Sequence, residues 1–165
     1  MAMQLTQGDV GLVQARAEFR KAHARAQLRG LFSRLMRRCV RLCSLGDAAD
    51  HLAQQAEGGA AGWARRPSLT ATAHTRLADV PIARIVGSLD RADDYTDDFL
   101  PLLGSDEERW ARVRVAADSL EGLPPVELYE LDGEYYVKDG HHRISVMRRM
   151  GIRSVEAYVS KLLAA

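Results

Sequence analysis

The pentapeptide Asp-Gly-His-His-Arg at residues 139–143 constrains the fold of this chain more than any other feature. It follows a strand-like run, Tyr135-Tyr136-Val137, and opens a helix-like run over 144–150. A strand, a glycine turn and a helix N-terminus together present backbone N–H groups and the positive end of a helix dipole to an anion, most often a phosphate. Two imidazoles and a guanidinium lie in the same turn. The sequence therefore predicts an anion site, and more narrowly a nucleotide site.

Each residue of this turn has a chemistry that suits such a site. Gly140 permits a sharp turn, and Arg143 can bind two phosphate oxygens in a fork. His142 can donate or shuttle a proton, and Asp139 can hold a hydrated Mg²⁺ or act as a base. We take Asp139, His141 and His142 as candidate catalytic residues. The alternative is a purely structural turn, because Asp and His are common in turns and helix caps.

The length and composition indicate one ordinary domain with an extension. A chain of 165 residues is too short for two full domains, and no apolar run approaches the roughly 18 residues that span a bilayer. The N-terminus lacks a cationic start followed by an apolar core, so no secretory signal is predicted. Cys39 and Cys43 have no further Cys ligands nearby, which disfavours zinc. We expect a soluble, cytoplasmic protein without a membrane partner.

The charge is distributed unevenly along the chain. Residues 1–45 carry nine Lys or Arg against two acids, and the remainder carries 14 basic and 20 acidic residues. Opposite charges on two parts of one chain indicate either an intramolecular contact or a basic arm for a polyanion.

Residues 13–45 predict a long basic amphipathic helix, because they contain no proline and a single glycine. Apolar residues recur at steps of three and four, which predicts one buried face: Leu28, Leu31, Leu35, Cys39 and Leu42, flanked by Phe32, Met36 and Val40. Off this stripe lie the candidate nucleic-acid-binding residues Arg25, Arg29, Arg34, Arg37, Arg38 and Arg41. In the alternative, the helix packs on the domain or on a second copy, and its arginines are solvated or face the acidic segment 93–98.

The rest of the chain alternates strand and helix signals. A break and cap over 44–47 precede a short helix over 48–55, and the small, polar residues 58–78 are typical of a linker. The later pattern predicts a strand over 80–86, a helix over 106–120 with Trp110, Val113 and Ala117 buried, strands over 126–131 and 134–138 joined by an Asp132-Gly133 hairpin, a helix over 144–150 ended by Gly151, and a strand over 154–159. The chain thus divides into a helical extension (1–57), a linker (58–78) and an α+β domain of βαββαβ order (79–165).

Residues 79–160 resemble the ParB/sulfiredoxin superfamily. The resemblance is carried by the entry strand with Pro81 and Ile82, the polar loop 88–91, a helix, the Pro-Pro-Val-Glu-Leu-Tyr strand over 124–129, a hairpin, and the Asp-Gly-His-His-Arg-Ile-Ser-Val run over 139–146. It covers about half of the chain. It implies a small mixed-sheet domain that binds a nucleotide.

The resemblance also implies roles for individual residues. The corresponding turn in ParB proteins is Gly-Glu-Arg-Arg and binds the phosphates of a cytidine nucleotide, while in sulfiredoxins it is Gly-Cys-His-Arg and binds ATP. Phosphate or nucleotide contacts are implied for Gly140, His142, Arg143 and Ser145, and for Ser88, Asp90 and Arg91 in a loop that faces the same pocket. For the three loop residues, a solvated loop is the alternative.

The chain departs from both branches of the superfamily at His141. This residue stands where sulfiredoxins have their reactive cysteine, so sulfinic-acid reduction is not expected. It also replaces the ParB glutamate, so metal binding would rest on Asp139. The Asp-Gly-x-His-Arg pattern is similar to that of free-serine kinases of the superfamily. Because no helix-turn-helix follows the domain before Ala165, sequence-specific centromere binding is not expected.

Three hypotheses of function follow. The first is a ParB-like domain that binds a nucleoside triphosphate, ATP or CTP, with NTP hydrolysis or phosphoryl transfer and with Mg²⁺ as a cofactor. The second is a nonspecific DNA- or RNA-binding module, or a nuclease, that uses the basic helix. The third is a non-catalytic adaptor that binds partners, including a second copy of itself, through the apolar face of that helix.

Overall fold

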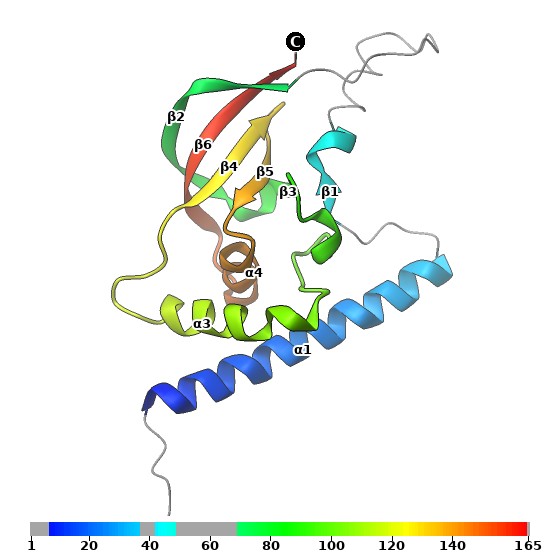
Figure 1. Ribbon diagram of the computed structural model, residues 1–165, viewed down its shortest axis with the longest axis vertical. Coiled ribbons are helices and arrows are strands. Elements are labelled where there is room, and N and C mark those ends of the chain that lie inside the picture. The colour runs from blue at the N-terminus through cyan, green and yellow to red at the C-terminus, as the bar shows by residue number, and fades with distance from the viewer. Residues whose placement is uncertain (1–6, 37–41, 49–68, 165) are drawn as a thin grey trace, which may run out of the picture.

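The computed structural model describes residues 7–36, 42–48 and 69–164, which form a mixed β-sheet with helices gathered at one end of it (Figure 1). The helices are α1 (Gln7–Met36), α3 (Glu107–Ala117) and α4 (His141–Met150). The strands are β1 (Cys43–Ser44), β2 (Leu69–Pro81), β3 (Ile85–Ser88), β4 (Val126–Leu131), β5 (Glu134–Asp139) and β6 (Ser154–Ala164). Short 3₁₀ turns occupy Ile82–Arg84, Ala92–Asp94 and Gly104–Asp106.

The sheet has the strand order β1-β3-β5-β4-β6-β2. The neighbours β3 and β5 are parallel, β5 and β4 antiparallel, and β4 and β6 parallel. In chain order β3, α3, β4, β5, α4 and β6 give the predicted βαββαβ unit, to which β1 and β2 add one strand at each edge. The prediction of a small mixed-sheet α+β domain preceded by a long helix is therefore confirmed.

The predicted hairpin at Asp132-Gly133 and the predicted helix end at Gly151 are both confirmed. Asp132 and Gly133 have φ angles of 49° and 79°, the left-handed pair that a two-residue hairpin between β4 and β5 requires. Gly151, with φ of 75°, follows the last residue of α4. Both boundaries agree with the sequence.

The strand predicted over 80–86 is two strands separated by a 3₁₀ turn. β2 pairs with β6 at one edge of the sheet, whereas β3 lies four positions away from β2 and pairs with β5, so one straight strand cannot occupy both places. The turn at Ile82–Arg84 carries the chain between them, held by a hydrogen bond of 2.9 Å from the Ile82 N–H to the Arg153 carbonyl. Moreover, β2 begins at Leu69, so residues 69–78 of the predicted linker are strand. The other part of that linker, 58–68, lies outside the described residues.

The helix predicted to reach residue 45 ends earlier. Cys43 and Ser44 form β1, parallel to β3, with Cys43 opposite Gly87. A side-chain Cβ at Gly87 would lie 2.5 Å from the Cys43 carbonyl oxygen, so this close approach requires glycine. The break over 44–47 is confirmed, because the Ser44 hydroxyl accepts hydrogen bonds from the N–H groups of Gly46 and Asp47 and caps helical residues 45–48. Residues 37–41 and the rest of the predicted second helix lie outside the described residues.

The buried face of α1 differs from the predicted leucine stripe. Ala15, Phe19, Ala22 and Ala26 are buried at helical spacing, while Leu28 is 55% exposed. The small alanines let α1 lie close to its neighbours, and Phe19 packs with Trp110 of α3 and Val146 of α4 in one cluster. Val113 and Ala117, which were predicted to be buried, are only partly buried against the same cluster. The side chains of residues 31–41 lie outside the described residues, and Leu42 is buried in the main core, as the stripe requires.

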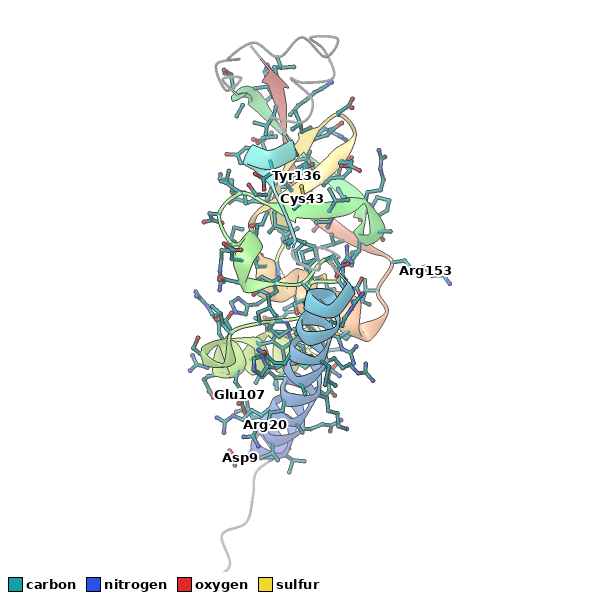
Figure 2. All side chains as sticks on the ribbon, turned by 90° about the vertical axis from the view of Figure 1, so that its right-hand side faces the viewer. Asp9, Arg20, Cys43, Glu107, Tyr136 and Arg153 are labelled. Atoms are coloured by element: carbon teal, nitrogen blue, oxygen red, sulfur yellow. The ribbon has the colours of Figure 1, made fainter. Side chains whose placement is uncertain are left out.

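Ion pairs connect α1 to acidic groups elsewhere in the chain. Arg16 contacts Glu108 at 2.6 Å, Arg20 contacts Glu107 at 3.0 Å, and the opposite pairing of Glu18 with Arg114 spans 2.9 Å. Figure 2 shows Arg20 of α1 close to Glu107 of α3. The uneven charge of the sequence thus corresponds to an intramolecular contact for these residues. Within the described ranges, no helix has the length and hydropathy needed to cross a membrane.

Candidate functional site

The predicted strand–glycine–helix turn is present at the junction of β5 and α4. Gly140 has φ of 104°, and a Cβ there would lie 2.6 Å from Cγ1 of Val126, so both its conformation and its surroundings require glycine. The helix starts at His141, and its first internal hydrogen bond runs from the Ile144 N–H to the Gly140 carbonyl at 2.9 Å. The N–H groups of residues 141–143 therefore have no acceptor within the helix. They supply the unpaired donors that an anion-binding helix terminus requires.

This terminus forms part of the wall of a pocket of about 600 Å³. The pocket is lined by five cationic side chains, two carboxylates, the turn itself and an apolar wall. The cations are Arg91, Arg109, Arg112, Lys138 and Arg143; the carboxylates are Asp90 and Asp139; and the apolar wall is Val113, Ala116, Leu123 and Pro124. An excess of positive charge beside an apolar wall suits an organic anion.

His141 is a buried, neutral imidazole in this wall. Its Nε2 lies 2.7 Å from the Ser88 hydroxyl, which in turn accepts a hydrogen bond of 2.9 Å from the Arg91 N–H. The ring stacks on Tyr95 with centroids 5.8 Å apart. Burial, helped by the charge of Arg91, lowers the pKa of His141 to about 4. His141 is therefore uncharged at neutral pH.

His142 lies beside a network of charged groups. Its Nε2 is buried without a hydrogen bond, 3.4 Å from Oδ2 of Asp106. That carboxylate accepts a hydrogen bond of 3.1 Å from Arg91, which also binds Asp94 at 2.6 Å. Burial lowers the pKa of His142, and the Asp106 carboxylate opposes this effect. His142 thus has a neutral ring nitrogen next to an anionic group, as a proton shuttle requires.

Arg143 connects the turn to the loop before β4. Its guanidinium donates hydrogen bonds of 3.1 Å to the Pro124 carbonyl and 2.7 Å to the Pro125 carbonyl, and it pairs with the Asp139 carboxylate. The Asp139 side chain is 68% exposed, so this ion pair is accessible to solvent and to a ligand. Arg143 therefore positions one wall of the pocket as well as facing it.

Most of the predicted site residues come together here, but the two serines do not. The pocket is lined by Asp90, Arg91 and residues 139–143, as the sequence predicts. Ser88 is fully buried behind His141. Ser145 is also fully buried and accepts a hydrogen bond of 2.9 Å from the Trp110 indole. Neither serine lines the pocket.

Sequence reasoning missed three cationic residues of the pocket. Arg109 and Arg112 lie on α3, and Lys138 is the last residue before the pentapeptide. The only available signal was their spacing: Arg109 and Arg112 are three apart on a predicted helix and so share a face. That spacing does not say which face meets the turn.

The predicted nucleic-acid-binding arginines are only partly described. Arg29 pairs with Asp98 and also lies 3.7 Å from Asp97, both in the acidic segment. Arg25 lines a different pocket. The side chains of Arg34, Arg37, Arg38 and Arg41 lie outside the described residues. Arg29 therefore contacts the acidic segment 93–98, which was the alternative to nucleic-acid binding for the arginines of this helix.

The donor groups do not form a metal cage around Asp139. In the described part of the chain, no group of three or more His, Cys, Asp or Glu side chains is placed to hold an ion. The Asp139 carboxylate is engaged by Arg143. A metal held by protein ligands alone therefore does not fit this site, and Mg²⁺ at Asp139 stays a prediction.

Comparisons with known proteins do not assign this chain to a family. Neither a protein-family model nor a curated protein matches the chain. Among solved structures, the sulfiredoxin of Arabidopsis thaliana matches with a TM-score of 0.40 and 16% sequence identity, over 52% of this chain and 85% of that one. Membership of the ParB/sulfiredoxin superfamily therefore stays a prediction.

Proposed function

We propose that this protein binds a nucleoside triphosphate, ATP or CTP, with its phosphates at the N-terminus of α4. The observation that carries the proposal is the Gly140 turn, whose free N–H groups belong to the wall of a pocket with five cations and two carboxylates. A triphosphate is the organic anion that makes fullest use of both the backbone N–H groups and several guanidinium groups.

The remaining walls suit the other parts of a nucleotide. Val113, Ala116 and Leu123 give an apolar surface for the base or the sugar. Asp139 can give up its pair with Arg143 to a phosphate, because the Asp139 carboxylate is 68% exposed and is solvated by water once it is released. The bonds of Arg143 to the two proline carbonyls keep its guanidinium in place during that exchange.

Hydrolysis or transfer of the terminal phosphoryl group is the reaction these residues can support. Asp139 is an exposed carboxylate beside the phosphate site and can accept the proton of an attacking water or hydroxyl. The neutral ring of His142 can receive a proton and pass it to Asp106. Mg²⁺ bound to the nucleotide would neutralise phosphate charge and would not depend on a protein-built site.

Calorimetric titration with ATP and CTP, with and without Mg²⁺, tests binding. Arg109→Gln is the most informative variant, because among the described residues Arg109 makes no hydrogen bond or ion pair whose loss would disturb the fold. Losing one charge-assisted contact should weaken binding about tenfold. Lys21→Gln removes the same charge from the exposed surface of α1 and should leave binding unchanged.

Two results would overturn the proposal. One is the absence of heat of binding with either nucleotide. The other is unchanged affinity in both Arg109→Gln and Arg143→Ala. Phosphate release and mass spectrometry of added hydroxyl acceptors then separate hydrolysis from transfer, and Asp139→Asn should abolish either reaction while retaining binding.

The other two hypotheses gain no specific support from the described residues. Arg16, Arg20 and Arg29 on α1 are each paired with a carboxylate of the same chain, which reduces the charge available to DNA or RNA. The described apolar face of α1 is covered by α3, α4 and the segment around Leu100. An adaptor or a dimer that used this face would have to displace them.

A further inference from the structure

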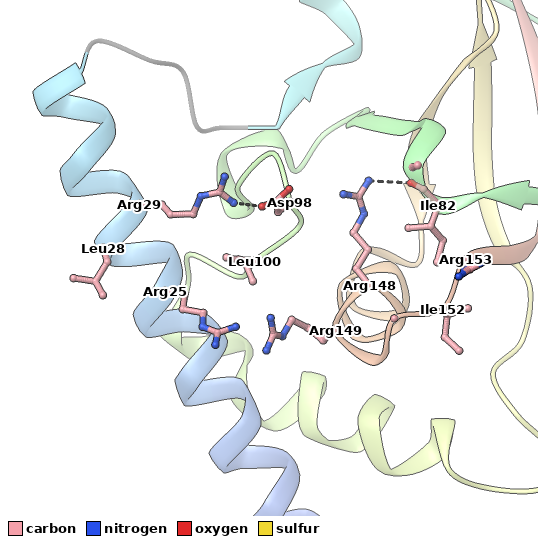
Figure 3. Close-up of a pocket in the computed structure, with 12 residues that line it drawn as sticks. Arg25, Leu28, Arg29, Ile82, Asp98, Leu100, Arg148, Arg149, Ile152 and Arg153 are labelled. Carbon is pink, nitrogen blue, oxygen red and sulfur yellow. Dashed lines mark hydrogen bonds and ion pairs between the residues drawn. The ribbon is translucent and has the colours of Figure 1, made fainter.

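A second and larger pocket, of about 950 Å³, lies at the other end of α4 from the turn (Figure 3). It is enclosed by α1, by the segment around Asp98 and Leu100, by the turn at Ile82–Arg84 and by the C-terminal end of α4. The two ends of this ten-residue helix are about 15 Å apart. The pocket is therefore distinct from the proposed nucleotide site.

The charged residues of this pocket are nearly all arginines. They are Arg25 and Arg29 of α1, Arg148 and Arg149 of α4, and Arg153. Among the described residues that line it, Asp98 is the one carboxylate, and it is already paired with Arg29. That hydrogen bond raises the pKa of Arg29. The pocket thus keeps an excess of positive charge after its internal pair is counted.

Arg148 is fixed in the wall of the pocket by hydrogen bonds to the backbone. It donates hydrogen bonds of 2.9 Å and 2.7 Å to the carbonyls of Ile82 and Ile85, and its guanidinium lies over the Phe99 ring. Its Nε is buried without a hydrogen bond. Burial lowers the pKa of Arg148, so a nearby anion would compensate for the water that this guanidinium has lost.

Arg25 and Arg149 are the two side chains placed to hold a ligand. Figure 3 shows their guanidinium groups pointing toward one another across the gap between α1 and α4. In the described ranges, neither has a carboxylate partner. Two like charges that face each other repel, and an anion between them converts this repulsion into two favourable contacts.

The floor of the pocket is aliphatic. Leu28 and Ile152 are 55% and 43% exposed and lie on opposite sides of the gap, and the lining also includes the buried side chains of Ile82 and Leu100. Among the described lining residues none is aromatic, which removes the stacking platform that nucleic-acid bases use. The chemistry therefore favours a ligand with an aliphatic body over a nucleobase.

We propose that this pocket binds an organic anion with an aliphatic body, whose phosphate or carboxylate head lies between Arg25 and Arg149 and whose body lies against Leu100 and Ile152. This site does not rest on the nucleotide proposal, because it shares no residue with the pocket at the turn.

Calorimetric titration of the full chain with octyl phosphate and octanoate tests the proposal. Inorganic phosphate provides the head alone and octanol the body alone, and both should bind at least about tenfold more weakly than octyl phosphate. Arg25→Gln and Arg149→Gln should each weaken the binding of octyl phosphate about tenfold, as the loss of a charge-assisted contact predicts. Lys21→Gln, one helical turn from Arg25 and outside the pocket, should not change it.

Further outcomes distinguish a phosphate head from a carboxylate head, and this pocket from the pocket at the turn. Tighter binding of octyl phosphate than of octanoate assigns a phosphate head, and the reverse assigns a carboxylate; either result supports the pocket. Octyl phosphate binding lost in Arg143→Ala but retained in Arg149→Gln would assign it to the pocket at the turn and overturn this proposal. Equal binding of inorganic phosphate or octanol, or binding only to vesicles that contain phosphatidic acid, would also overturn it.

Discussion

The hydroxyl oxygen of Ser88 lies 2.7 Å from Nε2 of His141 in the buried wall behind the Gly140 turn. Both side chains are almost fully buried, and Ser88 also receives the Arg91 N–H. The pair joins β3 and the loop after it to the first residue of α4 through a neutral imidazole. Any proton added to this ring would place a charge in a poorly solvated position next to Arg91.

Stability should therefore fall as the pH decreases from about 6.5 to 4. Above pH 6.5, the ordinary pKa of an unfolded histidine, His141 is neutral in both the folded and the unfolded protein. Between pH 6.5 and about 4, only the unfolded protein binds the proton. Below about pH 4, both the folded and the unfolded protein carry it. The free energy of unfolding should fall by about 1.4 kcal/mol for each pH unit in that window. His142 adds to the effect in the same direction, since its pKa is also lowered. Urea unfolding at several pH values in that window measures the slope.

His141→Gln is the variant that isolates this contribution. Glutamine can keep the hydrogen bond to Ser88 but does not titrate. The slope of unfolding free energy against pH should decrease by about 1.4 kcal/mol per unit relative to the wild type. Identical slopes in the two proteins would show that His141 is not buried in the neutral form.

The backbone at Gly140 should tolerate no side chain. Gly140→Ala combines an unfavourable φ of 104° with a Cβ placed 2.6 Å from Val126, so we expect a loss of about 3 kcal/mol or more. Gly151→Ala is the matched control at the other end of α4: its φ is 75°, and a Cβ there meets nothing within 4 Å. It should cost only about 1 kcal/mol. Thermal unfolding compares the two, and equal losses would mean that Val126 does not pack against the turn.

The sequence predicted best those features whose cause lies within a few residues. The Asp132-Gly133 hairpin and the Gly140 turn depend on backbone conformations that these residues favour, and the strand β4 was predicted to the residue. The candidate site residues 139–143 were found for the same reason, because they are contiguous. Features that depend on distant partners were missed.

Three errors show what local patterns leave out. The strand Cys43–Ser44 exists because Gly87 leaves room for it, and nothing near Cys43 indicates that pairing. The buried face of α1 follows Phe19, which packs on α3, and the small residues Ala22 and Ala26, which pack on Leu100, although leucines gave the stronger hydrophobic signal. Ser145 follows the turn closely in sequence, but its position on α4 directs it to Trp110 instead of to the pocket.

Tyr95 has a buried hydroxyl that makes no hydrogen bond with any described residue. Burial raises the pKa of Tyr95, as expected for a phenol removed from water. Tyr95→Phe removes this unsatisfied group and keeps the ring that stacks on His141, so it should stabilise the protein by about 1 kcal/mol. Tyr158→Phe, at a 46% exposed position, should change stability by less than about 0.5 kcal/mol. A loss of stability in Tyr95→Phe would reveal a partner for the hydroxyl.

The attachment of α1 depends chiefly on one aromatic side chain. Phe19 is 1% exposed, and its ring meets the Trp110 ring edge-on with centroids 5.9 Å apart. Phe19→Ala should cost about 3 to 5 kcal/mol through lost burial and the remaining cavity, and Phe19→Leu should cost less because it fills part of that space. Val13→Ala on the same helix, where Val13 is 61% exposed, should cost less than about 0.5 kcal/mol.

Denaturant unfolding monitored by tryptophan fluorescence measures these losses, since Trp110 lies in the contact. One cooperative transition that shifts with the Phe19 variants would show that α1 and the α+β domain unfold as a single unit. If Phe19→Ala left the transition unchanged, α1 would be an independent extension, as the sequence pattern alone suggests. The ion pairs between α1 and α3 are too weak to attach the helix without Phe19, because exposed pairs of this kind contribute at most about 1 kcal/mol each.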